Sequence, residues 1–297
     1  MNNDITFNLI DIDLVFNQLT SNNISQINEA SRQIAQYLKK NRQDSEEIIL
    51  RLSQFINSNL KNISLHIIIK IIITILKALS TNNNNQIIYI VKNFFPLIIS
   101  IILYSNWSIE EYDLLTSTLG KIISKCISHS GQLVESHIDF VFLKCKSERM
   151  EFPYLKYALI SLLKEFIKNS PVIAYNKIIE TFDNFIYIVS YYRDSNEYIR
   201  QNTAEMVMEF LLLLNNRDFQ IKEVYTKKIY SVIEFNLKST NGSIFSLHGT
   251  ILMLKAITVR REFFNEKYKM TFDFLYSLRY SKSQVIQYQI IDMIPFF

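Results

Sequence analysis

The stretch from Glu148 to Leu214 repeats its apolar side chains at intervals of three and four residues, which is the period of an α-helix. It predicts three consecutive amphipathic helices, and the second should begin with Ser170 as N-cap and Pro171 as first helical residue. The side chains expected on the buried faces are Leu155, Ala158, Leu159, Leu162, Leu163, Phe166 and Ile167; Ile178, Phe182, Phe185, Ile186 and Val189; and Ile199, Thr203, Met206, Val207, Phe210 and Leu214. Only the short turn 193–196 separates the last two helices, so we expect them to pack against each other as a hairpin.

Helical periodicity continues along most of the chain and divides into pairs separated by short polar turns. The expected pairs are Asp11–Leu19 with Ala30–Lys40, Ser45–Ser58 with Asn62–Leu79, Asn85–Tyr104 with Ser108–Ile127, Gln132–Ser147 with Met150–Lys168, Val172–Tyr191 with Asn196–Leu214, Ile221–Lys238 with Ser243–Arg260, and Glu262–Tyr280 with Ser283–Phe297. Second helices recur roughly every 35–46 residues, the period of helical repeat proteins. Small residues lie near the middle of several of them: Ala35, Ala158, Ala204 and Gly249. The pattern therefore predicts an all-α fold over residues 1–297, a right-handed α-solenoid of about seven helical hairpins.

Composition supports helices and argues against several other classes of protein. Glycine and proline number only 4 each, whereas β-sandwiches and nucleotide-binding α/β folds need glycine at turns and phosphate loops. Hydrophobic residues make up 48% of the chain and charged residues 20%, which is enough to form a large core. The net charge of +4 is small and scattered, so nucleic acid is not an expected partner.

Two apolar runs, residues 63–79 and 87–103, raise the question of a membrane span. They are interrupted by His66, Lys70 and Lys77 in the first run, and by Lys92 and Pro96 in the second. Neither supplies the roughly 20 uninterrupted apolar residues that a span needs. We expect both to be buried helices, with a membrane-embedded helical protein as the weaker alternative. The acidic N-terminus does not have the form of a secretory signal or a transit peptide. We expect a cytoplasmic location, with peripheral association with endomembranes as part of a complex as the second possibility.

No catalytic or metal-binding constellation is recognisable, and no cofactor is expected. The glycines are isolated, so there is no phosphate-binding loop. The four histidines (His66, His129, His137 and His248) and the two cysteines (Cys126 and Cys145) have no metal-ligand spacing. Glu135 and Asp139 on one helix face are expected to be solvated rather than to form an acid–base pair. Trp107 is expected to pack across a hairpin turn, with a partner-binding anchor as the alternative.

The turn and helix "YYRDSNEYIRQNTAE" contain the most specific pattern in the chain. Asp194, Ile199, Arg200 and Ala204 have the Asp-x(4)-Ile-Arg-x(3)-Ala form of a HEAT repeat, a helical hairpin that stacks on copies of itself. We expect Arg200 to reach the turn aspartate of its own or the adjacent repeat in a charge-assisted bond. Ala204 is expected to face a neighbouring helix so closely that leucine at this position would push the helices apart.

Five segments together resemble the N-terminal HEAT region of the target-of-rapamycin (TOR) serine/threonine kinases, which belong to the phosphatidylinositol-kinase-related group. They are "INEASRQIAQYLKK", "VESHIDFVFLKCKSERMEFPYLKYALISLLKEFIKNSP", "YNKIIETFDNFIYIVSYYRDSNEYIRQNTAEMVMEFLLLL", "SIFSLHGTILMLKAI" and "SQVIQYQIIDMIPFF". The likeness extends from about Asn28 to Phe297, and the third segment is the best match. Loops are shorter here, notably between Lys238 and Ser243, and many apolar positions are isoleucine.

The resemblance implies a non-catalytic scaffold, because the kinase domain of that family lies far C-terminal to this region. It implies contact with the regulatory scaffold subunit that recruits substrates, and with an activating small GTPase as a second candidate partner. The alternative is a stand-alone HEAT adaptor or an importin-type transport receptor. The apolar segment 285–297 further predicts that the solenoid continues into downstream repeats of its parent chain, and that the isolated chain exposes an apolar patch and self-associates.

Overall fold

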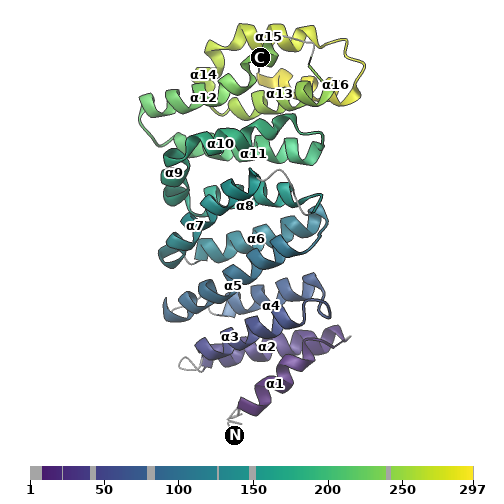
Figure 1. Cartoon of the computed structure of the whole chain (residues 1–297), viewed down its shortest axis with the longest axis vertical. Helices are drawn as coiled ribbons and strands as arrows, with labels where there is room; N and C mark the ends of the chain where they lie inside the picture. The colour runs from purple at the N-terminus through teal and green to yellow at the C-terminus, as the bar shows by residue number, and fades with distance from the viewer. Residues whose placement is uncertain are drawn as a thin grey trace. The chain divides into compact units, whose positions relative to one another are not determined.

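The computed structural model describes residues 9–21, 23–40, 45–78, 84–125, 127–146, 152–238 and 242–296. It is all-α, with 84% helix and no strand in these residues. The helices divide into two compact units, Met1–Gly131 and Gln132–Phe297, and the division falls inside α7. Each unit is built from helix pairs (Figure 1).

The first unit contains α1 (Leu9–Gln18), α2 (Ile24–Lys40), α3 (Ser45–Ser58), α4 (Leu65–Ala78), α5 (Asn84–Tyr104) and α6 (Ile109–Lys125). Helix α2 contacts α4 and α4 contacts α6, whereas α3 contacts α5, so every second helix meets its counterpart in the next pair. Among the largest fully buried side chains of this unit are Leu19, Leu38, Ile48, Phe94, Phe95 and Tyr112. The apolar runs noted above therefore supply buried faces, and none of the described helices has the length and hydropathy required to cross a membrane.

The turn between α5 and α6 shows how polar side chains end one helix and begin the next. The Trp107 indole donates a hydrogen bond to the Ile101 carbonyl at 2.9 Å, so Trp107 packs across the turn as the sequence predicts. Ser108 and Glu111 form a capping box: the Glu111 carboxylate accepts from the Ser108 N–H at 2.9 Å, and the Ser108 hydroxyl accepts from the Glu111 N–H at 3.3 Å.

The second unit contains α7 (Ile127–Cys145), α8 (Leu155–Asn169), α9 (Pro171–Glu180), α10 (Phe182–Val189), the 3₁₀ turn η1 (Ser190–Arg193), α11 (Glu197–Leu214), α12 (Phe219–Leu237), α13 (Ile244–Ile257), α14 (Arg261–Glu266), α15 (Tyr268–Ser277), α16 (Gln284–Met293) and the 3₁₀ turn η2 (Ile294–Phe296). Helix α8 contacts α11, α11 contacts α13 and α13 contacts α16. Helix α10 contacts α12, and α12 contacts α15. The apolar stripes predicted for α8 and α11 are all buried.

Several predicted helix limits differ from the structure. The single helix expected over 172–191 is divided at Thr181, whose hydroxyl donates to the Lys177 carbonyl at 2.9 Å and so competes with helical bonding. The helix expected over 262–280 is likewise divided, at Lys267. Helix α8 begins at Leu155, because Pro153 suits only the first turn of a helix.

The end of the last helix and the start of α2 also differ from the prediction, each because of local main-chain bonding. The last helix ends at Met293 and passes into η2, since Pro295 lacks an N–H to continue it. Helix α2 begins at Ile24, six residues before the predicted start, because the Asn23 side chain accepts the Ser25 N–H at 2.9 Å. Ser170 occupies the N-cap position of α9 as predicted, but its side chain accepts no N–H there.

Candidate functional site

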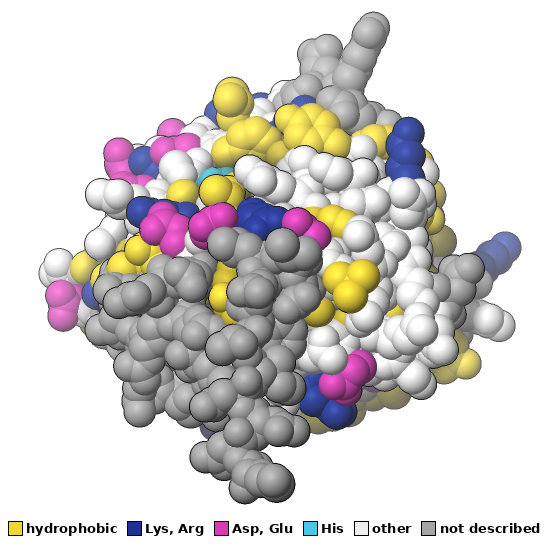
Figure 2. Space-filling model, turned by 90° about the horizontal axis from the view of Figure 1, so that it is seen from below, with side chains coloured by type: hydrophobic (Ala, Val, Ile, Leu, Met, Phe, Trp, Pro, Cys, Tyr) yellow, Lys and Arg dark blue, Asp and Glu magenta, His cyan; other side chains and the backbone are white. Residues whose placement is uncertain are grey.

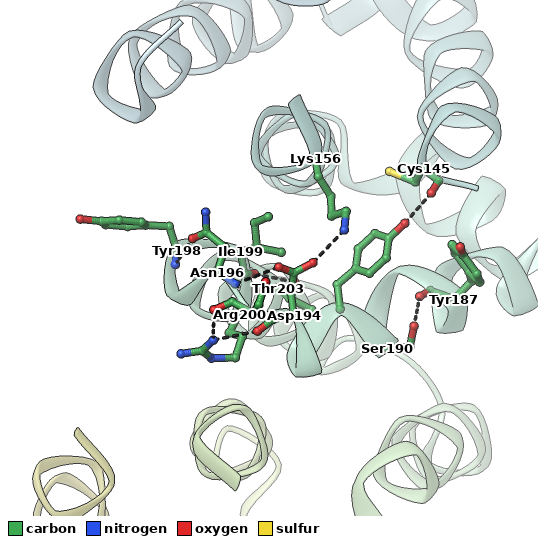
Figure 3. A network of polar contacts seen from close by, with 12 residues as sticks. Cys145, Lys156, Tyr187, Ser190, Asp194, Asn196, Tyr198, Ile199, Arg200 and Thr203 are labelled. Carbon is green, nitrogen blue, oxygen red and sulfur yellow. Dashed lines mark hydrogen bonds and ion pairs between the residues drawn. The ribbon is translucent and has the colours of Figure 1, made fainter. Parts of the chain in front are cut away.

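Asp194 links the turn before α11 to the preceding hairpin. Its carboxylate accepts the Asn196 N–H at 2.9 Å and pairs with the Lys156 ammonium of α8 at 2.7 Å (Figure 3). The same ammonium lies 4.5 Å from the centre of the Tyr191 ring. Asn196 then caps α11 by accepting the Tyr198 N–H at 2.9 Å. Asp194 thus shapes its own turn and also holds the neighbouring helix.

Arg200 carries the next connection, toward the following hairpin. Its side chain is buried, with 4% of the residue exposed. One guanidinium nitrogen, Nη1, donates to the main-chain carbonyls of Asp194 at 2.7 Å and Ser195 at 2.9 Å (Figure 3). Its Nε donates to His248 Nδ1 of α13 at 3.1 Å. Burial lowers the pKa of Arg200, and the negative charges of Glu197 and Asp194 oppose this shift.

Arg200 therefore contacts the turn aspartate of its own repeat as expected, although the accepting atom is not the carboxylate. Arg200 does reach Asp194, but through the main-chain oxygen, because the carboxylate is held by Lys156 and by the Asn196 N–H. The His248 partner was not predicted. It lies 48 residues away in sequence, and helical periodicity alone does not pair residues at that distance.

A second set of polar contacts joins α8 to α11 and was also missed by sequence reasoning. The buried Asn202 side chain donates to the Ser161 hydroxyl at 2.7 Å and to the Tyr157 carbonyl at 3.1 Å. Its amide oxygen accepts from the Lys164 ammonium at 2.8 Å. Lys164 also pairs with Glu205 at 2.8 Å. The one feature of the sequence that could have indicated these contacts is the polar residue Asn202, which lies beside the apolar stripe of its helix.

Several contacts between helices recur at one of two sequence separations. Pairs 38 residues apart are Asp13–Arg51, Asp139–Lys177, Lys146–Asn184, Lys156–Asp194 and Lys164–Asn202. Pairs 41 residues apart are Lys164–Glu205 and Lys168–Glu209. A recurring offset means that side chains at equivalent positions of neighbouring helices meet.

A buried polar cluster fastens η1 to α12 and α13. The Tyr192 hydroxyl donates to the Val232 carbonyl at 3.0 Å and accepts from the Asn236 amide at 2.9 Å. The same amide donates to the hydroxyls of Ser246 at 2.7 Å and Thr250 at 3.1 Å. Burial raises the pKa of Tyr192 above its ordinary value, while the neighbouring Arg193 opposes this shift.

Ala204 borders a pocket between α11, α13 and α16. Ala204 is 6% exposed, and the pocket has a volume of about 270 Å³. It is lined by Gln201, Ala204, Glu205, Met208, Leu252, Lys255, Ala256 and Gln289. Open space thus adjoins Ala204, so the expectation that leucine here must separate the helices does not fit this geometry.

Nine apolar residues on α15, α16 and the segments that follow these helices are exposed and are here named the α15–α16 face. Its exposed members are Tyr268, Phe272, Tyr276, Tyr280, Val285, Tyr288, Ile291, Ile294 and Phe296. The Phe272 ring stacks on Tyr268 and on Tyr276, and the Arg279 guanidinium lies 3.7 Å from the Tyr276 ring centre. A groove of about 210 Å³ runs between Phe272, Leu275, Tyr276, Arg279, Ile290 and Ile294.

The remaining candidate residues have ordinary structural roles or lie outside the described residues, as Cys126 and the His129 side chain do. Burial raises the pKa of the Cys145 thiol to about 12, which makes it a poor nucleophile. Asp139 pairs with Lys177 at 2.9 Å, while Glu135 is exposed. No cluster of potential metal ligands occurs among the described side chains. In Figure 2, Lys and Arg side chains (dark blue) lie next to Asp and Glu side chains (magenta) on the described part of the surface.

Comparisons with known proteins identify no family. No family model matches the chain. No curated protein matches it either. Among solved structures, the crystal structure of an engineered protein, a target of the Northeast Structural Genomics Consortium, aligns over 96% of both chains at 13% identity and a TM-score of 0.34. A likeness at that score supports no argument about fold or function.

Proposed function

We propose that the chain is an α-solenoid of HEAT-like hairpins that acts as a non-catalytic scaffold for protein partners. The observation that carries this proposal is the recurrence of inter-hairpin contacts 38 residues apart. Stacked repeats bury their apolar faces against their neighbours and leave extended surfaces for binding. Within this proposal, Asp194, Arg200 and Ala204 are structural repeat positions.

The α15–α16 face supports the scaffold role and has a specific proposed occupant. Each second helix of this unit packs on the next one, from α8 to α11, α13 and α16. Beyond α16 the same kind of surface is exposed, with Ile291, Ile294 and Tyr288 between 58% and 68% accessible. Apolar patches of several hundred Å² on proteins are commonly association sites. We propose that a further helical hairpin of the same type covers this face.

From the sequence resemblance we propose, more specifically, that this scaffold is the N-terminal arm of a TOR kinase. The partner expected from it is the regulatory scaffold subunit that recruits substrates, with a small GTPase second. A direct test measures binding of the purified chain to that subunit from the same organism by biolayer interferometry. Saturable binding supports the proposal, and absence of binding with both proteins folded contradicts the TOR assignment.

A genetic test separates the two scaffold classes. The reading frame after the codon for Phe297 should continue into further helical repeats and, far downstream, a kinase domain. A stop codon at that position with no kinase in the transcript would favour a stand-alone HEAT adaptor.

A further inference from the structure

The exposed side of α15 carries a row of stacked aromatic rings. The rings of Tyr268 and Phe272 lie 6.1 Å apart with planes 9° from parallel, and those of Phe272 and Tyr276 lie 6.0 Å apart at 14°. The guanidinium carbon of Arg279 continues the row, 3.7 Å from the Tyr276 ring centre and 4.4 Å from that of Tyr280. These four exposed aromatic residues are named the α15 ladder. Because neighbouring groups hold the rings in place, binding to the ladder costs less side-chain entropy than binding to free side chains.

Two oppositely charged side chains accompany the α15 ladder and have no ion pair with another described residue. Asp273 lies three residues before Tyr276, Arg279 lies three residues after it, and both are exposed. Three residues of α-helix or 3₁₀ turn span about 4.5–6 Å along the axis, so the two charges lie at similar distances on either side of Tyr276. Arg279 also donates to the Tyr276 carbonyl at 2.7 Å, which holds it beside the ladder.

This symmetric placement of charges is complementary to a second copy of the same chain. When two α15 helices lie antiparallel about a two-fold axis at Tyr276, Asp273 of each copy faces Arg279 of the other. The Phe272 ring then lies opposite Tyr280 of the second copy, so that aromatic surface meets aromatic surface. One patch thus supplies both halves of an isologous interface.

Other arrangements of the two helices are less favourable electrostatically. A parallel pair brings Asp273 beside Asp273 and Arg279 beside Arg279, and these like charges repel. An antiparallel pair shifted by one helical turn toward the N-terminus of α15 opposes Lys269 to Arg279, again with like charges. The opposite shift places Asp273 opposite Ser283 and leaves Arg279 without a carboxylate. The antiparallel register centred on Tyr276 pairs both charges.

We propose that two copies of this chain associate through their α15 ladders, antiparallel and related by a two-fold axis at Tyr276. Two ion pairs, one from each Asp273 to the Arg279 of the other copy, set the register, while the stacked rings supply the apolar contact. An isologous interface closes at two copies. The further hairpin proposed above would occupy the same face, so the second copy occupies it where that hairpin is absent. The inference does not rest on the TOR assignment.

Charge reversal tests this register in the full chain. We expect the wild-type protein to reach a dimer and no larger species in sedimentation velocity over a concentration series. Asp273→Arg and Arg279→Asp each oppose like charges in both pairs, so each should weaken dimerisation at least about tenfold. The double variant restores two pairs of opposite charge and should dimerise like the wild type. Glu262→Arg, at an exposed position of α14, changes the net charge as Asp273→Arg does and should leave dimerisation unchanged.

A mixture of the two single variants gives the most specific test. One variant has cations at both positions and the other has anions at both, so a 1:1 mixture should form a heterodimer although neither dimerises alone. The heterodimer also shows that neither substitution has disrupted the fold. A monomeric wild type, single variants that dimerise like the wild type, or a mixture that stays monomeric would each overturn the proposal. Failure to bind the TOR regulatory subunit would contradict the TOR assignment alone, because it alters none of these outcomes.

Discussion

The main chain at Tyr192 approaches Gly249 so closely that a β-carbon at position 249 would lie 1.6 Å from the Tyr192 carbonyl oxygen. Gly249 is in the interior of α13, where glycine is otherwise unfavourable by about 0.5–1 kcal/mol relative to alanine. The contact explains the exception, because η1 can pack directly on α13 only where no side chain intervenes. Sequence analysis identified Gly249 as a small residue near the middle of a helix, but it did not identify Tyr192 as the residue that packs against it.

Gly249→Ala should therefore destabilise the chain strongly. The nearest obstructing atoms belong to the main chain of Tyr192 and cannot rotate away. We therefore expect the free energy of unfolding to fall by at least the upper end of the ~1–3 kcal/mol typical of overpacking. Gly242→Ala is the matched control, since the nearest atoms to its added β-carbon are 3.6 Å away. Urea denaturation of both variants measures the difference, and equal stability would contradict the close approach.

The Arg200–His248 hydrogen bond predicts a loss of stability in acid. His248 must be neutral to accept from Arg200, and burial and then the Arg200 charge lower the pKa of His248, although the Glu197 charge opposes this shift. The unfolded chain then binds more protons below about pH 6.5, so stability is complete above that pH and falls as pH decreases, by at most about 1.4 kcal/mol per pH unit for this group. Burial lowers the pKa of His137 as well, which adds to the slope.

Thermal denaturation between pH 5 and pH 8 measures this effect. His248→Gln keeps a side-chain oxygen that can accept from Arg200, and it should reduce the dependence of the melting temperature on pH. A wild-type curve that is flat across this range would show that His248 is not held neutral in the folded state.

The buried amide of Asn202 should contribute to the α8–α11 contact. Asn202→Ala removes the hydrogen bonds to the Ser161 hydroxyl and the Lys164 ammonium. We expect the free energy of unfolding to fall by about 1–3 kcal/mol, because these polar groups are left without that partner. Asn265→Ala, at an exposed position of α14, serves as the control and should be near neutral. Equal denaturation midpoints for the two variants would argue against the contact.

Ala204→Leu and Ala158→Leu should behave differently although both alanines lie in second helices. Ala158 is fully buried and is not among the residues that line the described pockets, so leucine should cost roughly 1–3 kcal/mol there. Ala204 adjoins a pocket of about 270 Å³, so its leucine variant should lose less than about 1 kcal/mol. Differential scanning calorimetry compares the two, and an equal loss would indicate that the pocket closes in solution.

The α15–α16 face should make the isolated chain self-associate at high concentration. Ile294→Asp places a charge beside the apolar groove and should shift the protein toward monomer in sedimentation velocity. Phe235→Asp makes the corresponding change at an exposed apolar residue of α12, and it should leave association unchanged. A wild-type chain that remains monomeric at millimolar concentration would contradict the prediction.

Periodicity predicted the helices because burial on one face repeats every three to four residues within each helix. It did not predict the breaks at Thr181 and Lys267, where local bonding and packing outweigh an uninterrupted apolar pattern. The Asp-x(4)-Ile-Arg-x(3)-Ala spacing located the turn correctly. It could not identify His248 or Asn202 as members of the contacts, because these depend on how successive hairpins align in space.

The short sequence separation of these contacts also bears on how the chain is synthesised. The hydrogen bonds between hairpins described above join residues no more than 48 apart. A ribosome adding about 5–20 residues per second completes another 38 residues in about 2–8 s, whereas helical structure with local contacts forms in microseconds to milliseconds. Each hairpin can therefore dock on its predecessor before the next one has emerged, and its apolar face is exposed only for that interval.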